Sequence, residues 1–480
     1  MEVNAHSARA IRARIVQGEI SAHEILDETL ARLAGAEPSI NAFLTVDEAH
    51  ARSQIDALAA RLANGETPGL LWGVPFSVKD TYNTAGVRTT YGSRVFEDHL
   101  PSADAELVAR VRAAGGILIG KTNTPEFAIH VRTVNDLAPE TRNPWDVTRT
   151  SGGSSGGAAA SIGAGVTAIA IGSDGGGSVR IPAALCGAVG LMPSRGAIPR
   201  GGGRIGTRRF SSAGPIALDA LDAAALYFAM AGPSQHDGLT RGLFPTGVSG
   251  SSEAVKAPRI RWVGESGVPG VEPDVVAAAA AAVRTFAAET GGRVTESAAG
   301  MRADEFNPAF YRMMQSDRYS TGGRELLEDS RTAALLTDYA RHQFQGAAKL
   351  TPDLYSAAID VQLAAMEHLA MVLDGVDVVA TPTLGFIAPS IREGEIALPE
   401  DARRGFVSFT FLMNFTGLPA ITVPCGLVRG MPVGLQLIGR QGTEGMLLDL
   451  AARFQDRVFR LPSSPTAKHE TVSATERTRP

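Results

Sequence analysis

Two loops rich in glycine and serine stand close together in the chain and could aim backbone N–H groups at a reacting atom. The first runs from Ser151 to Gly157 and the second from Ser173 to Arg180. Glycine is needed where the backbone itself must approach a ligand, and successive N–H groups then attract negative charge. The segment between them, Ala158 to Ile171, is apolar and built from small residues, unlike a flexible linker. We therefore expect a buried segment flanked by two site-forming loops.

One chemistry for these loops is the nucleophile elbow of an α/β-hydrolase. The pattern GxSxG is matched twice, around Ser154 and around Ser155, which shows how easily a Gly/Ser-rich sequence satisfies it. The elbow also requires a strand before it. Residues 143–149 instead predict a loop, and no downstream histidine stands in an informative context. The sequence therefore disfavours the elbow.

A second chemistry is phosphate binding. Residues 115–122 satisfy the literal GxxxxGK[ST] pattern. That pattern binds phosphate when its middle residues form an open loop before a helix. Here residues 117–119 are Ile-Leu-Ile, which predict a strand, and Pro125 disfavours helix at Thr124. We treat the match as fortuitous and keep a P-loop-like nucleotide-binding protein as the alternative from another functional class.

A third chemistry is a serine nucleophile served by a lysine. Lys79 ends the apolar run that begins at Gly73, so partial burial is expected. Burial disfavours the charged form of a lysine, and a neutral lysine can activate a serine hydroxyl. Periodicity alone favours a plainer interpretation, in which Lys79 is a surface residue or an ion-pair partner of Asp80.

Taken together, these segments resemble the amidase signature family. The run Gly73–Asp80 is similar to its lysine motif, and Gly152–Gly157 and Asp174–Arg180 are similar to its signature. Further similar segments follow in the family's order, at Thr416–Ala420 and Met431–Gln436. The resemblance covers nearly the whole chain. It implies a hydrolase that cuts carbon–nitrogen acyl bonds through an acyl-enzyme, with no cofactor and no metal.

The resemblance also implies roles for individual residues. Ser178 would be the nucleophile, Ser154 would pass its proton, and Lys79 would be the base. Ser154 would follow a cis peptide bond from Gly153. The oxyanion would be stabilised by the N–H groups of Gly175, Gly176, Gly177 and Ser178.

Other positions are expected to support the loop or to contact substrate. Asp174 and Arg180 would fix the second loop by hydrogen bonds. The chain departs from the usual family pattern at Gly175, where Thr, Ile or Tyr is common, at Met192 and at Pro139-Glu140. The third glycine in a row could loosen the oxyanion loop or admit a bulkier acyl group. Substrate contacts are expected from Ala128, Ile129, Thr133 and Ser173.

A stand-alone amidase for small or aryl amides, carbamates, ureas or hydrazides is the leading function. The alternative within the family is the A subunit of a glutamyl-tRNA amidotransferase, which needs partner chains and glutamine. The run Thr124–His130 differs from the Met-Asp-Glu-Phe-Ala-Met-Gly type expected there, so the stand-alone amidase is preferred. The expected partners are a small amide and water, and a homodimer is the one assembly considered.

The elements that must position these loops predict an α/β fold. Residues 1–65 are expected as a helical segment, with a capping box at Ser21–Glu24. From residue 66 to 462, short apolar runs alternate with helical stretches, which predicts one large domain with a mixed sheet covered by helices on both faces. Residues 300–375 are expected to be mostly helical, and 463–480 to form a polar tail.

Composition narrows the partners and the compartment. The 480 residues are 44% hydrophobic with a net charge of −5, so no basic field points to nucleic acid or an anionic membrane. No uninterrupted apolar run approaches the length of a membrane span. The two cysteines, Cys186 and Cys425, allow at most one bridge and suit a reducing compartment. No HExxH or Cys/His cluster indicates a metal, and a cytoplasmic enzyme is expected.

Overall fold

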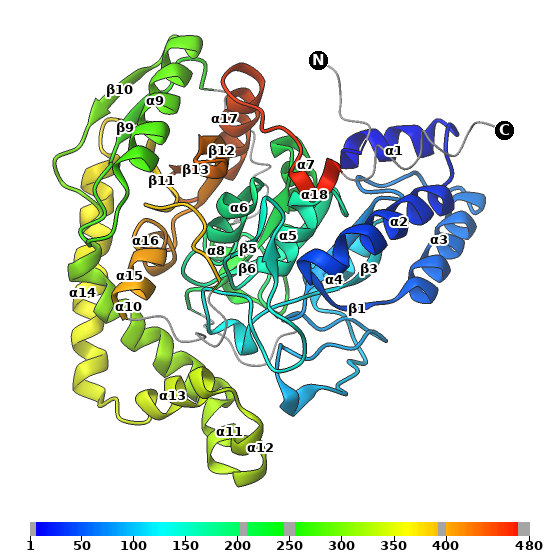
Figure 1. Cartoon of the computed structure of the whole chain (residues 1–480), viewed down its shortest axis with the longest axis horizontal. Helices are drawn as coiled ribbons and strands as arrows, with labels where there is room; N and C mark the ends of the chain where they lie inside the picture. Colours follow the sequence, from blue (N-terminus) through cyan, green and yellow to red (C-terminus); the bar gives the residue numbers. More distant parts are fainter. Residues whose placement is uncertain (1–5, 202–208, 244–254, 392–399, 469–480) are drawn as a thin grey trace.

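An eleven-stranded mixed sheet organises the molecule, and helices cover both of its faces (Figure 1). The computed structural model describes residues 6–201, 209–243, 255–391 and 400–468. The strand order is β1-β3-β2-β6-β8-β7-β12-β13-β11-β9-β10. The predicted α/β class with a mixed central sheet is confirmed. The strands are β1 (Phe43–Val46), β2 (Pro75–Lys79), β3 (Ile117–Thr122), β6 (Ile169–Asp174), β7 (Val189–Met192), β8 (Ser212–Ala217), β9 (Arg259–Trp262), β10 (Arg293–Glu296), β11 (Val378–Pro382), β12 (Ala420–Val428) and β13 (Met431–Ile438).

The helices fall into an N-terminal set, a set between the strands and a set that gathers on one side. The first two sets are α1 (Ala8–Val16), α2 (Ala22–Ile40), α3 (Glu48–Ala63), α4 (Glu106–Ala113), α5 (Gly156–Gly163), α6 (Arg180–Cys186), α7 (Ala220–Met230), α8 (Gly238–Leu243), α9 (Pro273–Thr290), α17 (Glu444–Arg457) and α18 (Pro465–Lys468). The third is α10 (Ala303–Arg318), α11 (Arg324–Glu328), α12 (Ser330–Leu335), α13 (Asp338–Ala347), α14 (Pro352–Leu373), α15 (Glu400–Val407) and α16 (Phe411–Thr416).

The N-terminal segment supplies a strand as well as helices. The capping box is confirmed: Ser21 Oγ accepts from the Glu24 N–H at 3.1 Å, and the Glu24 carboxylate accepts from the Ser21 N–H at 2.8 Å. Between α2 and α3, β1 pairs antiparallel with β3 at the edge of the sheet. Four residues are too few for periodicity to reveal a strand, which is why the sequence did not predict β1.

The predicted loop over residues 143–149 was wrong. Two short strands, β4 (Arg142–Asn143) and β5 (Asp146–Thr150), form a separate antiparallel ladder there. Most of β5 is polar and solvent-facing, so it lacks the apolar alternation by which a half-buried strand is recognised.

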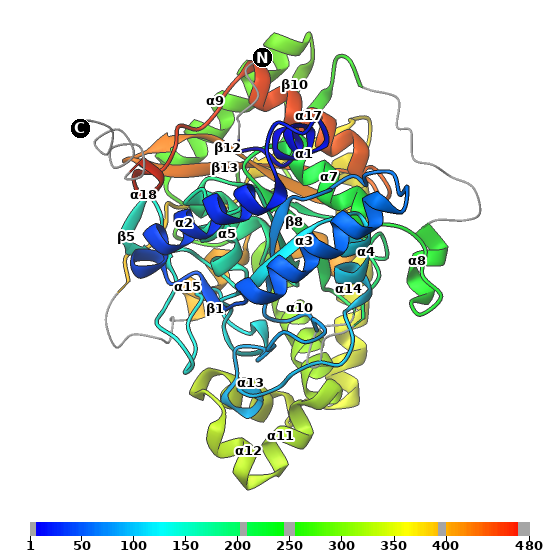
Figure 2. The ribbon, with the colours of Figure 1, turned by 90° about the vertical axis from the view of Figure 1, so that its right-hand side faces the viewer.

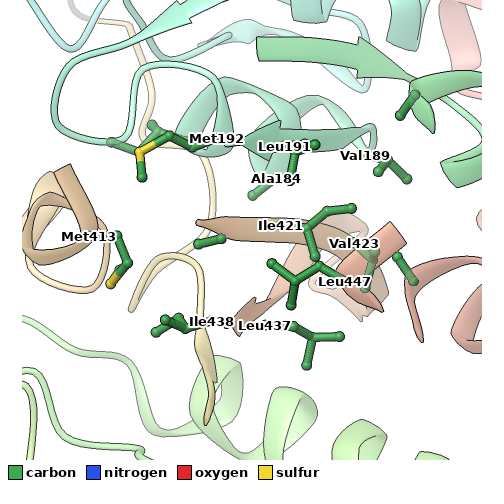
Figure 3. Close-up of a cluster of buried hydrophobic side chains, with 14 of the residues drawn as sticks. Ala184, Val189, Leu191, Met192, Met413, Ile421, Val423, Leu437, Ile438 and Leu447 are labelled. Atoms are coloured by element: carbon green, nitrogen blue, oxygen red, sulfur yellow. The ribbon is translucent and has the colours of Figure 1, made fainter. Parts of the chain in front are cut away.

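A dense apolar core lies behind the second Gly/Ser loop. Figure 3 shows Ala184 of α6 facing Leu191 of β7 and Ile421 of β12, with Leu437 of β13 beyond them. All four side chains are buried. Interiors packed to this density resist displacement, so α6 and the loop that leads into it are held in place.

Helices α10 to α14 form the mostly helical region predicted for residues 300–375. They run along one side of the molecule, and α11, α12 and α13 project beyond the sheet (Figures 1 and 2). In the described chain, α14 alone has the length and apolar composition to cross a membrane, which the sequence did not predict. One such helix is weak evidence, since core helices of globular proteins pass the same test, and α14 packs against α10 and α16.

Candidate active site

Lys79 lies at the centre of a cage of serine hydroxyls. It is the last residue of β2, which runs parallel to both β3 and β6, and its side chain is fully buried. Its Nζ lies within hydrogen-bonding distance of Ser154 Oγ at 2.6 Å, Ser173 Oγ at 2.8 Å and Ser155 Oγ at 3.1 Å. Neither plainer expectation for Lys79 holds, because it is not at the surface and its partners are hydroxyls.

The surroundings of Lys79 favour its neutral form. Burial lowers the pKa of Lys79 well below its ordinary value, because removing the ammonium from water is costly. The positive charge of Arg318 lowers this pKa further, and the negative charge of Asp174 acts in the opposite direction. A lysine poised in this way can accept a proton.

The first Gly/Ser loop is held tightly around the lysine. The peptide bond between Gly153 and Ser154 is cis, as expected. A side chain at Gly153 would press on the backbone of residues 131–132, with the Val131 carbonyl carbon only 2.9 Å away. Thr133 Oγ1 donates to the Gly152 carbonyl at 2.9 Å and accepts from the Gly156 N–H at 3.1 Å. The Thr133 hydroxyl, predicted to contact substrate, is therefore used to hold this loop.

Ser155 has no free hydroxyl for an elbow mechanism. It is fully buried at the start of α5. Its Oγ accepts from Lys79 Nζ and from the Ser173 N–H, and it donates to the Ser173 carbonyl, both Ser173 bonds being 3.1 Å. An elbow nucleophile must instead be exposed. Ser173, predicted to contact substrate, belongs to the same cage around Lys79.

The second loop is anchored by a buried ion pair. Arg180 Nε and Nη2 donate to the two carboxylate oxygens of Asp174 at 2.9 and 3.0 Å, and both side chains are fully buried. Burial by itself would raise the pKa of Asp174, but the Arg180 charge and hydrogen bonds outweigh this and lower it below the ordinary value. Asp174 and Arg180 thus hold the loop ends together, in keeping with the support expected of them.

Three more residues hold this loop and were not found from the sequence. Asn414 Nδ2 donates to the Asp174 backbone carbonyl at 2.9 Å, and its Oδ1 accepts from Arg180 at 2.7 Å. Gln436 Oε1 accepts from Arg180 at 2.7 Å, and Thr410 Oγ1 donates to the Gly176 carbonyl at 2.8 Å. They lie more than 230 residues beyond the loop, so local sequence carried no signal for these contacts.

The four expected oxyanion donors are not equivalent. The Gly177 N–H donates to Asp174 Oδ1 at 2.6 Å and is therefore already engaged. Gly177 has φ +123°, and a side chain there would collide with Thr410. Among the described residues, the N–H groups of Gly175, Gly176 and Ser178 make no hydrogen bond. These three remain free to meet a developing negative charge.

Ser178 lies at the accessible edge of the cage. It is partly exposed, whereas Ser154 is fully buried. The Ser178 carbonyl accepts from the Ser155 N–H at 3.1 Å, which joins the two loops. Its Oγ makes no hydrogen bond within the described part of the chain, so the transfer of a proton from Ser178 to Ser154 stays a prediction.

The remaining predicted substrate contacts lie on a strained turn. Phe127 and Ala128 both have positive φ, +50° and +58°, which non-glycine residues rarely adopt. Ala128 and Ile129 are half-buried, and the Ala128 carbonyl accepts from Arg318 Nη2 at 3.3 Å. Such strain is characteristic of functional sites.

The departures from the family pattern make ordinary contacts. Met192 Sδ accepts from Arg180 Nη2 at 3.2 Å, and Glu140 pairs with Arg132 at 2.5 Å. The GxxxxGK[ST] match is not a loop: Lys121 is fully buried in β3, where its Nζ donates to the Thr84 and Thr89 hydroxyls at 3.1 and 2.8 Å. The P-loop alternative is overturned, since this lysine is sequestered inside the sheet.

Replacing Arg180 by glutamine should lower the free energy of unfolding by about 3–5 kcal/mol, because Asp174 would remain buried without its counter-ion. Urea denaturation measures this loss. Arg284→Gln is the control, since its pair with Glu296 is exposed and should contribute within about 1 kcal/mol. An Arg180→Gln protein as stable as this control would contradict the anchoring role.

Known proteins resemble this chain over most of its length. The family model described as Amidase matches residues 24–448. The A subunit of glutamyl-tRNA(Gln) amidotransferase from Roseiflexus sp. (strain RS-1) is 34% identical over 482 residues, covering 95% of this chain and 97% of that protein. A bacterial aryl acylamidase of the amidase signature enzymes family superimposes with a TM-score of 0.85 at 25% identity, covering 94% of this chain and 96% of that one. The A subunit of glutamyl-tRNA(Gln) amidotransferase from Thermotoga maritima superimposes with a TM-score of 0.75 at 29% identity, covering 93% and 97%.

Proposed function

Because the chain belongs to the amidase signature family, we propose that it is an amidase acting through Lys79, Ser154 and Ser178. The observation that carries this proposal is the fully buried Lys79, whose Nζ lies 2.6 Å from Ser154 Oγ. A buried lysine whose pKa is lowered and whose amine is surrounded by hydroxyls is suited to serve as a general base. Activity of a hydrolase acting on carbon–nitrogen bonds fits both the family and this geometry.

The proposed reaction moves one proton along the relay and back. Neutral Lys79 takes the Ser154 proton as Ser154 takes the Ser178 proton, and Ser178 Oγ bonds to the acyl carbon. Collapse of the tetrahedral intermediate breaks the carbon–nitrogen bond, and the proton returns through Ser154 to the leaving nitrogen. A water molecule then attacks the acyl-enzyme by the same route, releasing the acid and regenerating Ser178.

The oxyanion is the second element of the proposal. We assign it to the N–H groups of Gly175, Gly176 and Ser178, because Gly177 already donates to Asp174. Donors fixed before the reaction stabilise the developing charge without reorganisation. Thr410, through the Gly176 carbonyl, helps to keep them fixed.

Two functions within the family have support. The structural likeness to an aryl acylamidase favours a stand-alone enzyme for small or aryl amides. The curated relatives named as A subunits of glutamyl-tRNA(Gln) amidotransferase favour the second candidate, a glutaminase that works with partner chains. We prefer the first, because Thr124–His130 departs from the run expected in those relatives.

Assays with the purified chain alone separate these functions. Release of an aniline from acyl anilides, without partner chains, is the expected result for a stand-alone amidase. Ammonia release from glutamine is measured beside it. Glutamine hydrolysis that appears only when partner subunits are added, with no turnover of any anilide, would favour the second candidate.

The dependence of kcat/KM on pH should have an acidic limb set by Lys79. The protonated lysine cannot accept a proton, so activity rises as Lys79 loses its proton. Because burial lowers this pKa well below 10.5, the midpoint should also lie well below 10.5. Hydrolysis of an uncharged anilide is followed from about pH 5 to about pH 11, with melting temperatures recorded as a control for unfolding. Activity that rises only near pH 10.5 would contradict a neutral Lys79.

A further inference from the structure

Arg318 is a buried cation with an unused hydrogen-bond donor. It ends α10 and is 7% exposed. Its Nη2 donates to the Ala128 carbonyl at 3.3 Å, but its Nη1 has no partner among the described residues. An unsatisfied buried donor is destabilising, more so on a charged group, so its retention calls for an explanation.

The neighbouring carboxylate of Asp317 does not supply a hydrogen-bond acceptor for the Arg318 guanidinium. Burial lowers the pKa of Arg318 to about 10, while the nearby Tyr311 and Asp317 raise it, so Arg318 stays charged at neutral pH. The Asp317 carboxylate is itself paired with Arg209, at 3.2 Å. The Ala128 carbonyl is a neutral acceptor. Arg318 thus has no carboxylate of its own within hydrogen-bonding distance in the described chain.

Arg318 lies beside the catalytic cage. Its positive charge is close enough to lower the pKa of Lys79. Phe310 of the same helix contacts the second loop, because a side chain at Gly176 would lie 3.3 Å from Phe310 Cζ. The Ala128 turn, which it contacts, leads directly into the backbone that packs on Gly153.

We propose that Arg318 is a specificity-determining residue that binds a carboxylate carried by the acyl part of the substrate. The inference rests on the proposed function and narrows it to amides with an anionic group, such as half-amides of dicarboxylic acids. A planar guanidinium matches a carboxylate in shape, and hydrogen bonds between ionised groups are among the strongest. Such a substrate would supply the acceptor that Nη1 lacks.

The test measures binding to Ser178→Ala by isothermal titration calorimetry. The probes are succinamate, glutaramate and adipamate, each paired with its uncharged counterpart: butyramide, valeramide and hexanamide. At least one carboxylated amide should bind about 10- to 100-fold more tightly than its counterpart. This binding measurement does not depend on catalysis. If no carboxylated amide binds preferentially, the proposed reaction is unaffected. If the wild-type protein hydrolyses no amide, binding to Ser178→Ala can still be measured.

Three further substitutions in the Ser178→Ala background identify the residue responsible. Arg318→Met should abolish the preference for the carboxylate. Arg318→Lys keeps the positive charge but lacks the planar guanidinium that can bind a carboxylate through two hydrogen bonds, so it should retain part of the preference. Arg312→Met, on an exposed position of the same helix, should leave it unchanged. Melting curves show which variants are folded. If Arg318→Met is not folded, the comparison is made with Arg318→Lys.

Two results would overturn the proposal. One is equal binding of every carboxylated amide and its counterpart to Ser178→Ala. The other is a preference that persists undiminished in a folded Arg318 variant. Equal weakening of both classes of ligand would show a purely structural role for Arg318 and would also overturn it.

Discussion

Ser178→Ala should lower kcat for amide hydrolysis by about 10⁴- to 10⁶-fold, the loss expected when a serine hydrolase loses its nucleophile. The reason is specific to this site: the hydroxyls of Ser154 and Ser155 are fully buried and bound to Lys79, so neither can replace Ser178. Initial rates with the best anilide or amide of the panel measure the effect.

The control for Ser178→Ala is its stability. Ser178 is partly exposed and its hydroxyl makes no hydrogen bond in the described chain, so the melting temperature should be unchanged. A folded Ser178→Ala protein with activity within tenfold of wild type would remove Ser178 from the mechanism.

Lys79→Met should lower kcat/KM by about 10³- to 10⁴-fold, as expected on losing a general base. The three serine hydroxyls would remain, but none can hold the proton released by Ser178. The residual activity should lack the acidic limb set by Lys79, since methionine does not titrate, so the loss relative to wild type should be smaller at low pH, where the wild-type lysine is protonated. Rates across the pH range used for wild type measure both effects.

Lys121→Met is the matched control for Lys79→Met. Lys121 is the neighbouring buried lysine, on β3, and its partners are Thr84, Thr89 and the Tyr82 carbonyl rather than the cage. Its loss should lower stability, because Asp80, 3.7 Å away, would lose a buried counter-ion. Equal losses of activity in two folded variants would mean that Lys79 acts through packing and not as a base.

Much of the site could be predicted because its residues lie in short, distinctive motifs. The loop around Ser154, its cis peptide and the burial of Lys79 all follow from local sequence together with the family resemblance. The mixed α/β class was predicted from alternating apolar runs and helical stretches. The domain boundaries at residues 65 and 462 remain predictions, although β1 joins the first segment to the main sheet.

What the sequence did not reveal depends on distant contacts. Asn414 and Gln436 reach Arg180 from more than 230 residues away. Gln436 ends the family-like segment Met431–Gln436, but nothing in that segment predicted its contact with Arg180, and no local pattern marks Asn414. Thr133 and Ser173 were expected to touch substrate because of where they stand in the chain. Their hydroxyls bond to the Gly152 carbonyl and to Lys79, contacts that only the three-dimensional arrangement reveals, and their contact with substrate stays a prediction.

Covalent labelling with a fluorophosphonate probe tests whether Ser178 is the nucleophile and whether Lys79 activates it. The modified peptide is mapped by mass spectrometry in wild type, Lys79→Met and Lys121→Met. We expect an adduct on Ser178 that forms at least about 100-fold more slowly without Lys79 and at a near-normal rate without Lys121. An adduct on Ser155, or labelling of Ser178 that is indifferent to Lys79, would contradict this mechanism.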